Sequence, residues 1–211
     1  MASRPLNLGM SIAAAALLTA AALIANTADA DVAIDAPAPV FTALDSTGAS
    51  VSLADFAGQP VILEWSNHDC PYVRKHYDAG AMQALQKSAA ANGFAWLTVV
   101  SSAPGEQGHV SAGQANALTE ARDAAPTRVL LDPEGEVGRL YAAKTTPHMF
   151  VINADGVVVY DGAIDDQNSA NPDTLEGATN YVALAINAVA KGEPVAIAQT
   201  QPYGCSVKYG S

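Results

Sequence analysis

The chain has 211 residues and a formal net charge of −11 at pH 7, from 21 acidic residues against 10 Lys and Arg. A surface this acidic repels nucleic acid and anionic membranes, so we exclude nucleic acid as a partner and expect small molecules or proteins. The length is that of one domain with a core of ordinary size, and no second domain is needed.

The first thirty residues have the pattern of a secretory signal peptide. Arg4 gives a positive start, residues 10–24 form an uncharged apolar run, and residues 28–30 (Ala-Asp-Ala) have the small-x-small pattern of a cleavage site. The alternative is a retained membrane anchor, but about 15 apolar residues fall short of the roughly 20 that span a bilayer. We therefore expect cleavage before Asp31, a periplasmic or secreted protein, and no membrane span after cleavage.

The first half of the mature chain alternates predicted strands with a long helix. Residues 40–44 and 51–53 flank an Asp-Ser-Thr-Gly turn and indicate a hairpin. Residues 60–65 are apolar enough for a buried central strand. Residues 71–91 favour one helix, which Gly80 weakens or kinks.

The second half continues this rhythm and ends in a tail. Strands are predicted at 94–100, 128–131, 149–153 and 157–160, and helical segments at 111–124, 138–143 and 174–191. This alternation, closed by a hairpin and a helix, predicts an α/β fold with a central mixed β-sheet and helices on both faces. We assign residues 31–192 to the domain and residues 193–211 to a C-terminal tail that carries Cys205.

Cys70 is the most informative residue, because it follows a predicted central strand and opens a helix. Pro71 fits the first helical turn, and Asp69 or a near neighbour can cap that helix. Free N–H groups at a helix start stabilise a thiolate, and Arg74, one turn later, adds positive charge, whereas Asp69 opposes both. The alternative is a small buried cysteine or half of a structural bridge. We favour a reactive thiol.

Cys70-Pro71, the strand before them, Thr146-Pro147 and the terminal hairpin together resemble the thioredoxin superfamily, over roughly residues 37–192. Residues 48–63 are similar to the beginning of periplasmic thioredoxin-like reductases and of the alkyl hydroperoxide reductase/thiol-specific antioxidant (redoxin) group. The resemblance implies a thioredoxin-like fold with an N-terminal β-hairpin extension and a nucleophilic Cys70. It also implies a cis Pro147 that packs beside the thiol and shapes the substrate groove.

The sequence departs from both groups at the active-site motif. A thioredoxin Cys-x-x-Cys needs a second cysteine where Val73 stands, and a peroxiredoxin needs Pro and Thr where Leu63 and Asn67 stand. Cys205, in the Gly-preceded tail, is the candidate resolving thiol, which would release a mixed disulfide or sulfenic acid formed on Cys70. A static Cys70–Cys205 bridge and an unpaired tail thiol are the alternatives.

We therefore expect an exported thiol-disulfide oxidoreductase that uses Cys70, Cys205, Pro147 and Arg74. Its substrates would be protein or small-molecule disulfides, and an external reductant would recycle the enzyme. Peroxide reduction, and with it antioxidant activity, is the alternative within the same chemistry.

A copper- or partner-binding carrier on the same fold is a further alternative, with Cys70 and His148 as contacts. The candidate ligands are His68, His76 and His148, but a soft metal site would need a second thiolate near Cys70. We expect no metal and no cofactor.

Overall fold

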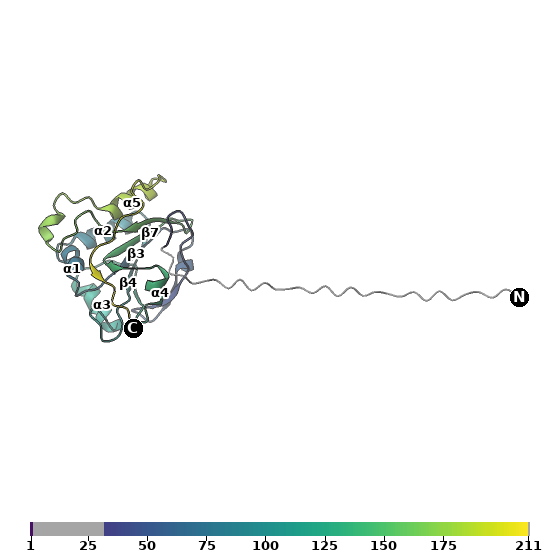
Figure 1. Ribbon diagram of the computed structural model, residues 1–211, viewed down its shortest axis with the longest axis horizontal. Coiled ribbons are helices and arrows are strands. Elements are labelled where there is room, and N and C mark those ends of the chain that lie inside the picture. Colours follow the sequence, from purple (N-terminus) through teal and green to yellow (C-terminus); the bar gives the residue numbers. More distant parts are fainter. Residues whose placement is uncertain (2–31, 211) are drawn as a thin grey trace.

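The computed structural model describes Met1 and residues 32–210, so the predicted signal peptide, apart from Met1, lies outside the described residues. Within residues 32–210 a seven-stranded sheet forms the centre of the molecule (Figure 1). Its strands are, in spatial order, β2 (Ser50–Ser52), β1 (Thr42–Asp45), β5 (Arg128–Leu131), β4 (Ala95–Val100), β3 (Val61–Trp65), β7 (His148–Ile152) and β8 (Val158–Gly162).

The sheet is mixed, with β3 near its middle. Strands β3, β4 and β5 are parallel, whereas β1 and β7 run antiparallel to their neighbours. All five residues of β3 are buried, and Leu63 pairs with Leu97 of β4 and Phe150 of β7. A strand covered on both faces reads as a continuous apolar run, which is why residues 60–65 were recognisable as a central strand.

Five α-helices and two short 3₁₀ helices lie around the sheet in the described chain. The α-helices are α1 (Pro71–Asp78), α2 (Ala81–Ala91), α3 (Ala112–Ala121), α4 (Glu136–Leu140) and α5 (Tyr181–Ala190), and the 3₁₀ helices are η1 (Leu53–Phe56) and η2 (Pro172–Leu175).

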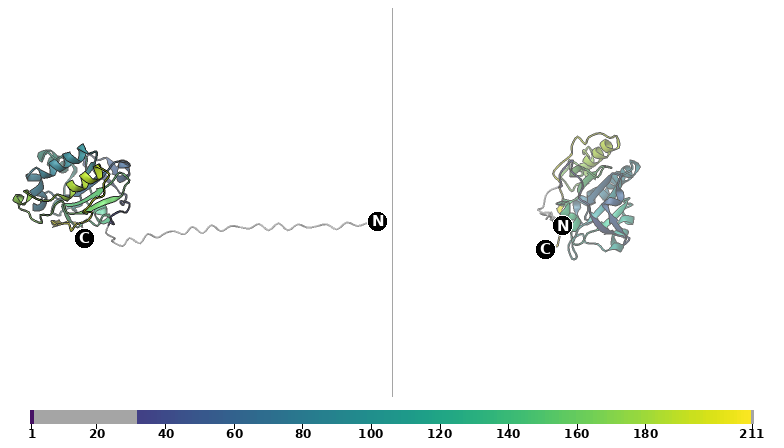
Figure 2. Two further views of the ribbon diagram at one scale, coloured as in Figure 1. Left: turned by 90° about the horizontal axis from the view of Figure 1, so that it is seen from above. Right: turned by 90° about the vertical axis from the view of Figure 1, so that its right-hand side faces the viewer.

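Two apolar clusters hold the helices to opposite faces of the sheet. Helices α1, α2 and α5 share one cluster with the strand residues Ile62 and Met149, and Figure 2 shows these helices on one side of the sheet. The other cluster joins Trp65 to Tyr141, which follows α4, and to Phe41 ahead of β1. The predicted fold class, a thioredoxin-like mixed sheet covered on both faces, is confirmed in this arrangement.

Two helix predictions are wrong in extent. The single helix over 71–91 is two helices, because Gly80 has a φ of +72°, a left-handed conformation that ends one helix and starts the next. The helix expected from residue 174 begins only at Tyr181, where the side chain of Asn180 accepts a hydrogen bond from the Ala183 N–H at 2.8 Å. The residue at the N-cap of α1 is Cys70 itself, so Asp69 does not cap that helix.

The C-terminal residues lie against the domain over much of their length. Thr200 N–H donates to Asp161 O of β8 at 3.0 Å, and Val207 N–H donates to Lys144 O at 3.1 Å. Between these points a two-residue strand, β9 (Cys205–Ser206), pairs antiparallel with β6 (Thr145–Thr146). The end of the described chain reaches α4, where Arg139 donates to Gly210 O at 2.8 Å (Figure 1).

In the part of the chain that the structure describes, no helix is both long enough and apolar enough to cross a bilayer.

Candidate functional site

A short turn carries the chain from β3 to Cys70 at the start of α1. The side-chain oxygen of Asn67 accepts a hydrogen bond from the Asp69 N–H at 2.9 Å, and the Cys70 N–H donates to Asn67 O at 3.1 Å. Pro71 occupies the first turn of α1, where it sacrifices no helical hydrogen bond. The thiol is thereby held at the positive end of the helix, and Cys70 is 0% exposed.

Cys205 lies in direct contact with Cys70. The Sγ atoms of these two free cysteines are 2.7 Å apart, and Cys205 remains partly exposed. The β6–β9 pairing sets this approach, since Thr146 and Cys205 are partners in the register. Gly204 is required for it, because a Cβ at this position would overlap the carbonyl oxygen of Thr146. Its φ of +136° is also unfavourable for other residues.

The Thr146–Pro147 peptide bond is cis, as the resemblance implied. The Thr146 carbonyl oxygen lies 3.1 Å from Cys70 Sγ and accepts a hydrogen bond from the thiol. Pro147 thus belongs to the segment that packs beside the thiol.

The environments of the two thiols shift their pKa values in opposite directions. Burial raises the pKa of Cys70, but hydrogen bonds with Cys205, with Thr146 and with the backbone of Val73 more than offset this, so that the pKa is lowered overall. Burial and the neighbouring Cys70 sulfur together raise the pKa of Cys205 to about 11. Of the pair, Cys70 therefore loses its proton more readily than Cys205.

A buried polar cluster anchors the chain just before Cys205; we call it the tail anchor and define it as Lys75, Asp165 and Tyr203. The Tyr203 hydroxyl donates to the Asp165 carboxylate. The ammonium of Lys75 lies 3.7 Å from Asp165 Oδ2 and 3.4 Å from the Tyr203 hydroxyl, and it donates to Gln167 O at 3.0 Å. Burial lowers the pKa of Lys75, and Asp165 partly restores it.

His76 lies against this tail anchor without a hydrogen bond. Its Nε2 is 3.8 Å from Asp165 Oδ2, and neither ring nitrogen has a hydrogen-bonding partner among the described residues. Burial lowers the pKa of His76 to about 4, against the opposing charge of Asp165. His76 is therefore neutral at pH 7.

A second buried carboxylate lies within β3 itself. Glu64 is 0% exposed and accepts hydrogen bonds from Trp96 Nε1 at 2.8 Å, the Tyr77 hydroxyl at 2.9 Å and the Thr98 hydroxyl at 3.1 Å. Burial raises its pKa, and these donors oppose the rise. Glu64 therefore joins β3, β4 and α1 behind the site.

The structure does not bring Arg74 to the thiol. Its side chain is 60% exposed, and its Nε lies 3.7 Å from Asp78 Oδ2 one turn further along α1. The groups that shift the pKa of Cys70 are its neighbours in β6, β9 and the first turn of α1. The Arg74 N–H donates to Cys70 O at 2.9 Å, as in any helix, but the side chain pairs with Asp78, so a role for its charge at the thiol stays a prediction.

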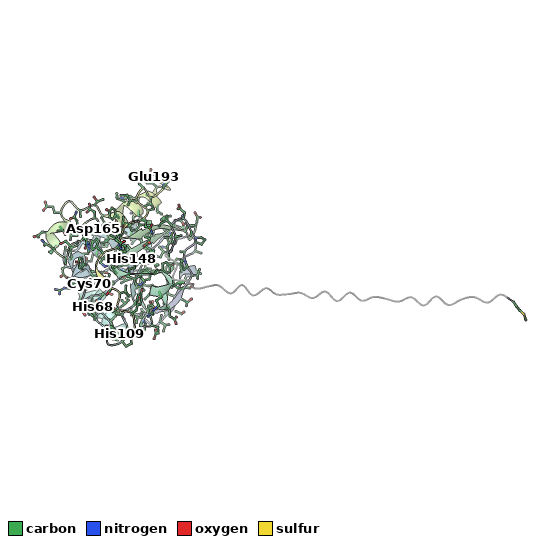
Figure 3. The ribbon with its side chains drawn as sticks, viewed as in Figure 1. His68, Cys70, His109, His148, Asp165 and Glu193 are labelled. Carbon is green, nitrogen blue, oxygen red and sulfur yellow. The ribbon has the colours of Figure 1, made fainter. Side chains whose placement is uncertain are left out.

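The three histidines considered as metal ligands each lie beside a different carboxylate. His148 Nε2 is 2.7 Å from Asp161 Oδ1, His68 Nε2 is 3.5 Å from Asp69, and His76 faces Asp165. Figure 3 shows Cys70, His68 and His148 on the molecule, and no group of three metal-binding side chains converges among the described residues.

Sequence reasoning identified both cysteines and the cis proline but missed the tail anchor and Glu64. The anchor joins α1, the loop after β8 and the tail, and no spacing in the sequence signals such a meeting. Glu64 did carry a signal, because a lone carboxylate inside a fully buried strand needs buried donors around it.

Comparison with known proteins gives one family and many similar folds. Residues 34–161 match the family model described as "AhpC/TSA family". No curated protein matches the chain. A hypothetical protein from Sinorhizobium meliloti 1021 has a TM-score of 0.70 at 22% identity, covering 86% of this chain and 97% of its own.

Two further solved structures have similar folds. An uncharacterized conserved protein from Geobacillus kaustophilus has a TM-score of 0.71 at 22% identity, covering 84% of this chain and 93% of its own. A putative thiol:disulfide interchange protein DsbE from Chlorobium tepidum has a TM-score of 0.54 at 25% identity, covering 74% of this chain and 99% of its own. The likenesses support a thioredoxin-like fold.

Proposed function

The chain belongs to the AhpC/TSA family, and on that premise we propose that it is an exported thiol-disulfide oxidoreductase in which Cys70 is the nucleophile and Cys205 the resolving thiol. The observation that carries the proposal is the contact of the two sulfurs at 2.7 Å, in environments that lower the pKa of one and raise that of the other. Such a pair favours exchange, because the thiol that ionises more readily lies beside the thiol with which it can form a disulfide.

The proposed cycle transfers two electrons from the protein to a disulfide substrate. The Cys70 thiolate attacks one substrate sulfur, forms a mixed disulfide and releases the other substrate sulfur as a thiolate, which takes a proton from water. Cys205, after losing its proton to solvent, then attacks Cys70 Sγ, so that the substrate leaves fully reduced and a Cys70–Cys205 disulfide remains. An external dithiol, or two monothiols, returns the protein to its reduced form.

Intact-mass measurement after thiol alkylation tests this proposal directly. Oxidised protein should take up no alkyl group, and reduced protein should take up two. The potential of the bridge should lie above about −300 mV, since structural disulfides generally lie below that value. A more negative potential, or full disulfide reductase activity in Cys70→Ser, would refute a working couple.

Peroxide reduction is the second candidate, and the family itself favours it. The residues in the peroxiredoxin Pro and Thr positions argue against it: Leu63 is buried in β3, and the Asn67 side chain is occupied by the Asp69 N–H and Gln107 O. Stopped-flow measurement of hydrogen peroxide turnover discriminates between the two, because a competent peroxidase would oxidise Cys70 much faster than a disulfide does.

Export rests on the signal-like pattern of residues 1–30. In a periplasmic or extracellular setting the reductant must itself be exported or pass electrons across the membrane. The similar protein from Chlorobium tepidum, a putative thiol:disulfide interchange protein, fits the same proposal.

A further inference from the structure

A cavity separate from the two thiols lies over β4 and β5, between α3 and the turn that leads from β3 to α1; we call it the α3 cavity. Neither cysteine lines it. Cys70 Sγ contacts Thr146 and Cys205, and Thr146 comes just before β7, which borders β3 on the side opposite to β4. The α3 cavity is therefore not part of the thiol site.

Most of the wall of the α3 cavity is apolar. Its apolar side chains include Leu118 of α3, Val110 of the loop before α3 and Val129 of β5. The hydroxyls of Thr98 and Thr119 also line it, but they donate to the buried carboxylate of β3 at 3.1 Å and to a backbone carbonyl of α3 at 2.9 Å. Neither hydroxyl proton is left for a ligand.

Two polar side chains meet in this wall and have unused hydrogen-bonding capacity. Nδ1 of His68 is buried and has no hydrogen-bonding partner among residues 32–210. Arg122 donates from Nη2 to His68 O at 3.1 Å, and its guanidinium lies 4.7 Å from the centre of the Tyr77 ring. In the described part of the chain no carboxylate lies within ion-pair distance of this guanidinium, and the neighbouring Asp123 pairs with Lys87 at 2.7 Å.

The charge of the chain makes this free cation informative. The sequence has 21 acidic residues against 10 Lys and Arg, so carboxylates are abundant. A half-buried Arg122 without a counter-ion, beside an imidazole nitrogen without a partner, favours an anionic group supplied by a ligand.

The α3 cavity has room for a short hydrocarbon group. Its volume is about 50 Å³. An apolar cavity of about 150 Å³ holds one benzene molecule, so this one accommodates about two carbon atoms. An apolar wall with a few convergent polar groups is the usual design of a small-molecule site.

We propose that the α3 cavity is a binding site for a small aliphatic carboxylate. The carboxylate accepts hydrogen bonds from the Arg122 guanidinium and from His68 Nδ1, in the tautomer that carries its proton there. The alkyl group lies against the apolar wall around Leu118. This site goes beyond the proposed function and does not depend on it, because neither cysteine takes part.

Propionate is the probe, because its ethyl group has the size that the cavity accommodates. The full reduced chain, labelled with ¹⁵N, is titrated with sodium propionate at pH 7 while sodium chloride keeps the ionic strength constant. We expect saturable shifts of the amide signals of residues 66–68 and 115–122, with half-saturation at millimolar concentration. Propionamide, which has the same shape without the charge, should bind at least about tenfold more weakly. Shifts that do not saturate, shifts only elsewhere, or equal binding of propionamide would overturn the proposal.

Two variants test the wall and the charge separately. Ala115→Leu adds three carbon atoms to the wall and should weaken propionate binding more than about tenfold. Ala121→Leu is the matched control, since the same change is made on an exposed position of α3 outside the cavity.

Arg122→Gln should weaken binding at least about tenfold, as the loss of the ligand charge does, and it decides the matter if Ala115→Leu fails to fold. Lys191→Gln removes the same charge from the exposed end of α5 and should leave binding unchanged. Unaltered binding in Arg122→Gln, or in a folded Ala115→Leu, would refute the site.

Cys70→Ser separates this proposal from the oxidoreductase function. The variant lacks the proposed nucleophile but keeps the whole wall of the α3 cavity, so its affinity for propionate should stay within about twofold of the wild type. Loss of propionate binding in Cys70→Ser would contradict a separate site. Failure of the oxidoreductase function has a different result, namely no Cys70–Cys205 disulfide in the oxidised protein.

Discussion

Removing one hydroxyl from the tail anchor should loosen the hold on Cys205. Tyr203→Phe deletes the hydrogen bond to the Asp165 carboxylate and the 3.4 Å contact with Lys75 Nζ. Asp165 keeps the Gln167 N–H at 2.9 Å on Oδ1, but its Oδ2 already has no hydrogen-bonding partner among the described residues. The buried carboxylate is thus left short of donors.

The expected loss of stability follows from the one hydrogen bond that Tyr203→Phe removes. A hydrogen bond to a charged group contributes about 1.5–3 kcal/mol. For a domain of this length that corresponds to a fall in Tm of about 3–12 °C. If the loss frees the tail in the reduced protein, where no covalent bond holds Cys205, the disulfide becomes easier to reduce. Since about 1.4 kcal/mol equals 30 mV for two electrons, the potential should rise by up to about 30–60 mV.

The assay is equilibration of the protein with a glutathione redox buffer, read by alkylation and intact mass, alongside thermal unfolding of the reduced form. Tyr72→Phe is the matched control, because the Tyr72 ring contacts the Tyr203 ring at a centroid distance of 5.8 Å, and the substitution keeps that ring. It should leave the potential unchanged. A Tyr203→Phe protein with the wild-type potential and Tm would refute the anchoring role.

Three further changes test the other groups around the site. The Glu64 carboxylate accepts hydrogen bonds from three side-chain donors, whereas the amide in Glu64→Gln is itself partly a donor. The free energy of unfolding measured in urea should therefore fall by about 1–3 kcal/mol. An unchanged free energy of unfolding would mean that the three donors find other acceptors. The pKa of His76 is about 4 in the folded protein, against an ordinary value of 6.5. Between pH 6.5 and pH 4 the imidazole is protonated in the unfolded chain but neutral in the folded protein, so the stability of the fold decreases as the pH drops through this range. His76→Leu should reduce that fall by up to about 3 kcal/mol in unfolding experiments across this pH range, and an unaltered pH profile would contradict a neutral buried imidazole. Arg74→Ala should change the alkylation rate of Cys70 less than about twofold, because an exposed charge paired with Asp78 acts weakly at a distance. A tenfold slowing would show that Arg74 does activate the thiol.

Local patterns were sufficient to predict the central part of the fold. The apolar run of β3 and the turn between β1 and β2 are signals within a few residues of sequence, and both elements form where they were expected. The break at Gly80 was harder, because a glycine within a helical pattern is compatible with either a kink or a stop. Only the surrounding packing decides between them.

The site could be predicted only as far as its separate residues. Cys205 was a candidate because the sequence contains two cysteines, but its contact with Cys70 depends on a two-residue strand that is too short to have a periodicity. Gly204 was noted only as the residue before Cys205. A glycine is needed there because the backbone passes close to Thr146, and this contact exists only in the folded chain. The tail anchor likewise arises from three segments that meet only in the folded chain.

The contact between Cys70 and Cys205 joins positions 135 residues apart in the chain. A covalent bond there would close a loop containing most of the domain, and the loss of chain entropy in the unfolded state would favour the folded form by about 5 kcal/mol. Each turnover would then alternately form and break the bond that closes this loop. Resistance to heat and to proteolysis would therefore report the oxidation state of the protein, even without a label on either thiol.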